Sequence, residues 1–131
     1  MIMKKFYLLA VLLFFGFAVT GYAQEGVPAD QVIKMVKDEY DLGKLKFKKG
    51  TTFYMEFTNI SKKPVIVQNV MVGCGCTVAE KPSAPIMPGK VGKIKVGYDA
   101  TAAVGSTFKK DVTIKIKGAQ PKTVYFTGEI I

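Results

Sequence analysis

Hydrophobic and polar residues alternate along much of the chain, and this is the pattern of strands that bury one face. In Thr51–Ile60 the apolar side chains of Phe53, Met55 and Phe57 fall on one side of an extended backbone. Three later segments alternate in the same way: Lys93–Tyr98, Phe108–Lys117 and Thr123–Ile130. The residues that they turn inward are Ile94, Val96, Tyr98, Phe108, Val112, Ile114, Ile116, Val124, Phe126 and Ile130. Strands with one polar face are typical of antiparallel sheets that contact water on that face.

The middle of the chain contains one more predicted strand and a long connection. Val65–Gly73 is largely apolar and β-branched, which favours a strand. Thr77–Gly92 carries three prolines, and proline cannot donate to a ladder, so we interpret this segment as a connection and not as a central strand. Within it, Pro88 and Gly89 fit the two central positions of a type II turn.

Shorter strands are predicted upstream, at Val32–Val36 and Leu45–Phe47, on either side of Gly43. Three acidic residues lie between them: Asp38, Glu39 and Asp41. They lack the spacing of a calcium loop, and we interpret them as a solvated turn. About seven short strands, separated by turn signals every 8 to 12 residues, predict an all-β antiparallel sandwich.

The first residues have a different pattern, that of a signal peptide. Lys4 and Lys5 precede the uncharged apolar run Phe6–Val19, and small residues occupy the positions that a signal peptidase reads, Gly21 and Ala23. The run is shorter than the roughly 20 apolar residues of a membrane-spanning helix. We therefore predict a signal peptide over residues 1–23 and one domain over residues 24–131. That domain would be periplasmic or extracellular and would keep no stable membrane anchor after cleavage.

The positive charge of the chain comes from lysine alone, and this narrows the classes of ligand. All 19 basic residues are lysines against 10 acidic residues, and the sequence has neither arginine nor histidine. Arginine supplies the planar fork that recognises phosphates and base edges, and lysine does not reproduce it. Histidine is a usual base beside a cysteine nucleophile. These features argue against a nucleic-acid partner, and the sequence offers no catalytic set, no cofactor site and no closed metal site.

One motif could carry chemistry, Cys74-Gly75-Cys76-Thr77, which contains both cysteines of the chain. With one residue between them, the cysteines point to the same side of an extended backbone. Their parity is shared with a set of apolar residues: Ile66, Val70, Val72 and Val78. This parity predicts an inward position near the end of a strand.

Three interpretations of the cysteine pair stay open. The thiols can be two small buried hydrophobes. They can form a disulfide, as in many exported proteins, although residues two apart in a strand reach the limiting Cα separation, so that pairing needs a bend at Gly75. They can also be a thiolate site for redox exchange or for a soft metal such as Cu(I). Methionines could then add thioether ligands if the fold brings them near: Met55, Met71 and Met87.

Several segments, taken in order, resemble one bacterial family. They are Tyr40–Leu45, Phe57–Asn59, Lys63-Pro64, Val70–Thr77, Ile86–Lys90, Val96–Asp99 and Phe126–Ile130. Over Ile33–Ile130 the chain is similar to the exported family called domain of unknown function 1573. The resemblance implies an immunoglobulin-like sandwich of the PapD-like type and brings no established activity. Leu42 stands where we would expect an aromatic residue.

From these observations we expect a non-enzymatic module of the cell envelope that binds another protein or has a structural role. Its partner would be an envelope or extracellular protein. Strand addition at an open sheet edge would suit this fold, and the choice of edge depends on the tertiary structure. The alternative is an envelope protein for thiol redox exchange or Cu(I) handling that acts through Cys74 and Cys76.

Overall fold

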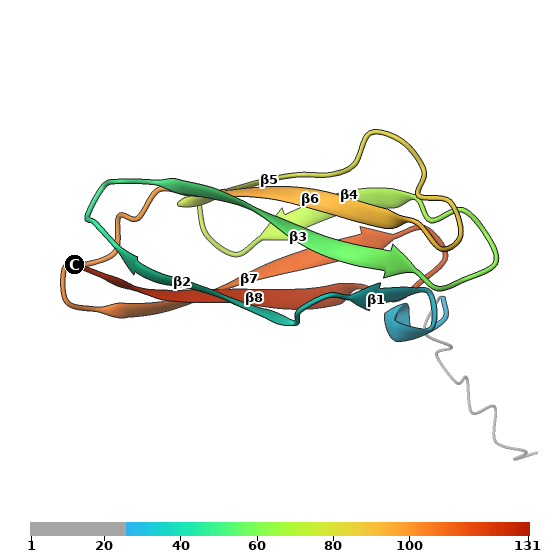
Figure 1. Cartoon of the computed structure of the whole chain (residues 1–131), viewed down its shortest axis with the longest axis horizontal. Coiled ribbons are helices and arrows are strands. Elements are labelled where there is room, and N and C mark those ends of the chain that lie inside the picture. The colour runs from blue at the N-terminus through green and yellow to red at the C-terminus, as the bar shows by residue number, and fades with distance from the viewer. Residues whose placement is uncertain (1–25) are drawn as a thin grey trace, which may run out of the picture.

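The computed structural model describes residues 26–131, which form two four-stranded β-sheets packed face to face (Figure 1). A short 3-10 turn, η1 (Ala29–Gln31), precedes the strands. These are β1 (Ile33–Met35), β2 (Glu39–Leu45), β3 (Thr51–Asn59), β4 (Val67–Val72), β5 (Thr77–Glu80), β6 (Val91–Tyr98), β7 (Thr107–Ile116) and β8 (Lys122–Ile130). The predicted all-β sandwich is confirmed, with eight strands in place of about seven. The predicted signal peptide, residues 1–23, lies outside the described residues.

The order of the strands is that of the immunoglobulin fold. One sheet of that fold has the order A-B-E-D and the other contains G-F-C. The first sheet here runs β1-β3-β6-β5, and the second runs β2-β8-β7-β4, so that β2 is added beside the strand equivalent to G. β1 and β2 are thus two halves of one leading strand. The first half joins one sheet and the second half joins the other.

The interior contains the residues that the alternation predicted. The buried ones are Met55, Phe57, Ile94, Val96, Tyr98, Phe108, Val112, Ile114, Ile116, Val124, Phe126 and Ile130. Phe53 is half-buried, and its ring packs edge-on against Phe126 with centroids 5.3 Å apart. Burial of these apolar side chains between the sheets is the main favourable term in folding.

β2 differs from the prediction in two ways. It pairs parallel with β8, although we expected antiparallel pairs throughout, and it includes Glu39 and Asp41, which we had interpreted as a turn. The acidic residues are exposed, whereas Tyr40 and Leu42 between them are half-buried and pack against the core. The strand pattern was therefore present, but the charged residues of its outer face resembled a turn.

The second predicted upstream strand, Leu45–Phe47, is also wrong, because β2 ends at Leu45. Gly43 does not separate two strands. It lies inside β2 with φ +69°, at a β-bulge between Asp41 and Lys44. The Asp41 carboxylate accepts a hydrogen bond from the Gly43 N–H at 2.8 Å and holds this bulge in place.

The inward parity predicted for β4 and its surroundings is wrong at both ends. Ile66 and Val78 are 41% and 65% exposed, whereas Val65 and Val67 are buried. For Ile66 the reason is a β-bulge between Val67 and Asn69, which adds a residue and exchanges the two faces of the strand. Val78 lies in β5, a separate strand that follows a turn, so the alternation of β4 does not continue into it.

The connection predicted at Thr77–Gly92 begins with a short strand, β5, which is an edge strand of the first sheet and ends before the three prolines. The rest of the segment does connect β5 to β6. The predicted type II turn is confirmed, since Gly89 has φ +76° and the Lys90 N–H donates to the Met87 carbonyl at 3.0 Å.

Candidate functional site

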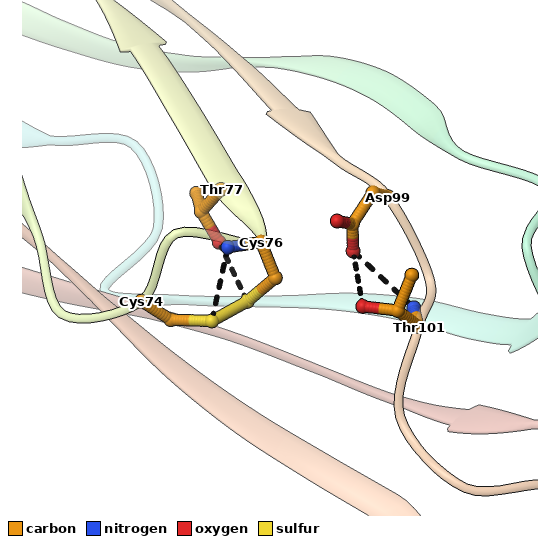
Figure 2. The surroundings of a disulfide bond; sticks show 5 residues. All are labelled: Cys74, Cys76, Thr77, Asp99 and Thr101. Atoms are coloured by element: carbon orange, nitrogen blue, oxygen red, sulfur yellow. Dashed lines mark hydrogen bonds between the residues drawn. A yellow bond between two sulfur atoms is a disulfide. The ribbon is translucent and has the colours of Figure 1, made fainter.

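The Cys74-Gly75-Cys76-Thr77 motif forms a tight bend between β4 and β5 (Figure 2). Cys74 and Cys76 are joined by a disulfide, and their Cα atoms are 5.2 Å apart. The Thr77 N–H donates to the Cys74 carbonyl at 3.2 Å, and the Cys76 N–H donates to Cys74 Sγ at 3.1 Å. The bend thus shortens the Cα separation of an extended strand into the range that a disulfide accepts.

The bend is attached to the end of β6. The Asp99 N–H donates to the Cys76 carbonyl at 3.0 Å, and the Asp99 carboxylate accepts from the hydroxyl of Thr101 at 2.8 Å (Figure 2). Thr77 is buried, and Cys74 and Cys76 are both half-buried, with Cys76 packed against the core. Both cysteines therefore lie at the boundary between the interior and the surface.

Gly75 does not have the role that we expected, because its φ lies outside the left-handed region and an added Cβ would meet no atom within 4 Å. The glycine with a close neighbour is Gly73, where a Cβ would lie 2.6 Å from Oδ1 of Asp111. The backbone closes the bend without needing a glycine between the two cysteines.

The thioether ligands considered for a soft metal are not gathered at this bend. Met55 is buried beside Ile94, four positions along β6 from Tyr98, and Tyr98 marks the end of the ladder where the bend lies. Met71 and Met87 are exposed on other segments. Within residues 26–131, three or more His, Cys, Asp or Glu side chains nowhere come together in a group that could hold a metal ion.

Tyr98 lies next to the bend because it pairs with Thr77 across β5 and β6. Its ring packs against Phe108 with centroids 4.6 Å apart, and its hydroxyl is buried without a hydrogen-bond partner in the described part of the chain. Burial raises the pKa of Tyr98, and the negative charge of Asp99 raises it further. The backbone of Ala102 lowers this pKa, but by less than the other two causes raise it.

Lys122 fastens the leading segment to β8. Its ammonium lies 2.8 Å from Oδ1 of Asp30 and 3.4 Å from Oδ1 of Asp38. The hydrogen bond to Asp30 raises the pKa of Lys122; burial offsets part of this rise, and Asp38 adds to it. These contacts hold the chain where it crosses from one sheet to the other.

The outer strands differ in how well their edges are covered. On β4, the Lys81 ammonium donates to the Gln68 carbonyl at 3.2 Å, and the Asn69 side chain accepts from the Val70 N–H at 2.9 Å. The bulge before Asn69 also interrupts this strand, as the bulge at Gly43 interrupts β2. Bulges and side-chain caps of this kind discourage pairing with another chain.

The edge of β3 is only half covered. β1 pairs with Phe57–Asn59 and no further. At the next edge position the Glu56 carbonyl accepts from the Val36 N–H at 3.0 Å, and the Glu56 N–H donates to the Tyr40 hydroxyl at 3.1 Å. Beyond Glu56, towards Thr51, β3 has no strand of residues 26–131 beside it on this side.

Thr52 and Tyr54 present backbone groups to this uncovered side. Successive residues of a strand face opposite neighbours, and Asn59 faces β6 because its N–H donates to the Lys90 carbonyl at 2.9 Å. Since the β3–β6 register is regular, Thr52 and Tyr54 face away from β6, on the side of Glu56. Their N–H and C=O groups have no partner among the described residues, and both side chains are exposed. We call these groups the β3 open edge.

Comparison with known proteins identifies a family. The family model described as "Protein of unknown function (DUF1573)" matches residues 33–130. No match is found among curated protein sequences. Within residues 26–131, no helix has the length and apolar content that crossing a bilayer requires.

Three solved structures show a similar fold. A protein of unknown function from Porphyromonas gingivalis W83 has a TM-score of 0.63 and 19% identity, covering 87% of this chain and 51% of that one. The chain therefore spans about half the length of that protein. PapD-like domain 7 of human CEP192 has a TM-score of 0.58 and 7% identity, and the match covers 89% of this chain and 95% of that one. A chain of the CsuC–CsuE chaperone–tip adhesion subunit complex of Acinetobacter baumannii has a TM-score of 0.56 and 10% identity, and the match covers 74% of this chain and 56% of that one. At these identities the likeness shows the fold alone, which is the PapD-like immunoglobulin sandwich.

Proposed function

The chain belongs to the family "Protein of unknown function (DUF1573)", and from this premise we propose that it is a non-enzymatic, exported module of the cell envelope. In this proposal it binds an extended segment of another envelope protein by strand addition at the β3 open edge. The fold supports the proposal, because immunoglobulin-like sandwiches commonly bind proteins through their edges and loops. The similarity to a chaperone–adhesion subunit complex is in keeping with an envelope location.

The observation that carries the proposal is the contrast between edges. β4 and β2 are interrupted by bulges and capped by side chains, and the edge strand β5 has only four residues, whereas β3 is regular and uncovered at Thr52 and Tyr54. An added strand would continue the line of β1 along β3. Each backbone hydrogen bond that it forms contributes about 0.5–1.5 kcal/mol, and alternate side chains would face Tyr54 on the outer surface.

Hydrogen exchange tests whether this edge is open. In the free protein we expect the amides of Thr52 and Tyr54 to exchange fast, because they face solvent. The amides of Phe53 and Met55 point to β6 in the ladder and should be protected. A bound strand should slow the exchange of the Thr52 and Tyr54 amides. Protection of Tyr54 in the free protein would contradict the proposal.

A proline at position 54 tests the binding itself. Tyr54→Pro removes the N–H that faces the open side and leaves the hydrogen bonds to β6 in place. We expect it to recover at least tenfold less partner from an envelope extract, as measured by quantitative mass spectrometry. Tyr54→Phe is the matched control and should recover as much as the unchanged protein. Equal recovery by a folded Tyr54→Pro variant would refute binding at this edge.

The variant C74S/C76S distinguishes strand addition from the thiol-based alternative. Strand addition needs no sulfur, so this variant should keep both the partner and the exchange pattern of Thr52 and Tyr54. Loss of the partner in a folded C74S/C76S protein, together with tight Cu(I) binding by the unchanged protein, would favour the alternative.

A further inference from the structure

A pocket of about 460 Å³ opens at the end of the sandwich opposite the cysteine bend. β3 runs from Thr51, whose partner Tyr98 lies beside the bend, to Asn59, which leads into the loop at the pocket. The pocket lies between that loop, the turn after β7 and the segment around η1. Figure 1 shows these three segments at the same end of the molecule. Its volume falls within the roughly 300–1,000 Å³ of small-molecule sites.

The inner lining of this pocket is apolar. Val65 and Ile116 are each 2% exposed and belong to the core, and Val32 is half-buried against it. These side chains come from three different segments, before β1, before β4 and at the end of β7. The pocket therefore reaches the edge of the hydrophobic core between the two sheets.

The mouth of the pocket carries positive charge without a counter-charge. Lys62, Lys63 and Lys117 line it, and among residues 26–131 no Asp or Glu does. None of these lysines forms an ion pair in the described structure, where the paired lysines are Lys93, Lys109 and Lys122. Three ammonium groups around one opening repel one another, and an anion between them would relieve this repulsion.

We infer that this pocket binds a small amphipathic anion, an alkyl chain with one terminal anionic group. The chain would lie against Val32, Val65 and Ile116, and the anionic group would lie among the three lysines. Lysine acts as a point charge and imposes no planar geometry, so the charge of the head group decides recognition and its shape does not. This site is separate from the β3 open edge and does not depend on the proposed function.

The test is calorimetric titration of the purified protein with hexanoate, octanoate and decanoate below their micellar concentrations. Each methylene that enters the apolar lining should tighten Kd about fourfold. Decanol, which has the chain without the charge, should bind at least tenfold more weakly than decanoate at low salt. The decanoate affinity should fall as salt rises, because the exposed lysines are screened. Decyl sulfate, which carries the same single charge on a head group of different shape, should bind like decanoate.

Two triple variants with the same change in net charge locate the site. K62Q/K63Q/K117Q should weaken decanoate binding about tenfold at low salt, because charge-assisted contacts are lost. K46Q/K49Q/K95Q, which changes exposed lysines outside the pocket lining, should bind like the unchanged protein. Methyl signals of Val32, Val65 and Ile116 should shift in the NMR spectrum on titration. A Kd independent of chain length, equal weakening in both variants, or shifts confined to other methyl groups would each overturn the assignment.

Discussion

Asn59, at the end of β3, shows how a single side chain holds a loop of this protein together. It is 1% exposed, and all of its polar atoms are bonded. Nδ2 donates to the carbonyls of Lys63 and Ile86, both at 2.8 Å, and Oδ1 accepts from the N–H and the hydroxyl of Ser61 at 2.9 Å and 2.7 Å. A fully bonded buried amide specifies one conformation, because each group would be costly if left unpaired.

Replacing Asn59→Ala should lower the free energy of unfolding by about 1–3 kcal/mol, since the Ser61 N–H loses its partner. The carbonyls of Lys63 and Ile86 each lose one of two donors and keep the Ser61 hydroxyl and the Val65 N–H, respectively. Urea unfolding followed by circular dichroism measures this loss. Ser61→Ala is the control and should cost less than about 1 kcal/mol, because the bond from its N–H to Asn59 remains. Equal losses in the two variants would contradict the central position of Asn59.

At the scale of elements, the close approach of β2 to β8 depends on Gly128. A Cβ at this position would lie 2.9 Å from the Gly43 carbonyl oxygen and would also contact the Phe108 ring. The Gly43 oxygen belongs to the backbone, so relieving this contact would require β2 to move away from β8; the Phe108 ring, whose Cζ would lie 2.5 Å from the Cβ, would also have to move. The parallel pairing of these strands thus needs a residue without a side chain at position 128.

Gly128→Ala should lower the free energy of unfolding by about 1–3 kcal/mol through this crowding. Gly75→Ala provides the comparison, because a Cβ there meets no atom within 4 Å and the change should stay within about 0.5 kcal/mol. Urea midpoints of the two variants measure the difference. A Gly128→Ala protein as stable as Gly75→Ala would show that β2 can shift freely along β8.

At the scale of the whole molecule, two groups link stability to alkaline pH. The pKa values of Tyr98 and Lys122 are raised in the fold above their ordinary values of 10.0 and 10.5. A raised pKa means that the folded chain holds its proton more tightly than the unfolded chain. The contribution of each group to the free energy of unfolding is therefore complete below the pKa that the group has in the unfolded chain. It is lost as the pH rises through the pKa that the group has in the folded chain.

We expect the free energy of unfolding to fall as the pH rises above about 10, which urea titrations at several pH values measure. Tyr98→Phe should reduce this fall and leave the part that comes from Lys122. At neutral pH the variant should be at least as stable as the unchanged protein, because it removes a buried hydroxyl without a hydrogen-bond partner. A rise in stability above pH 10, or the same fall in the variant, would contradict the assignment.

Much of the fold could be predicted from the sequence because strand burial is a local pattern. The alternation around Phe57, Val96 and Ile114 identifies the inward faces of β3, β6 and β7, and all three residues are buried. The cysteine motif could also be recognised as a candidate site. Its pairing geometry could not be predicted, because the bend is closed by hydrogen bonds to residues whose conformation the spacing does not specify.

What the sequence alone determined is the period of two, and with it most of the strands and the core; the order of its short motifs indicated the family. Only the tertiary structure decided the faces of Ile66 and Val78, the parallel partner of β2, the open half of β3 and the pocket beside Lys63. The physical reason is that a bulge, an edge or a pocket depends on the neighbouring segment, which contributes its hydrogen bonds from far along the chain. Residue-to-residue alternation contains no information about that neighbour.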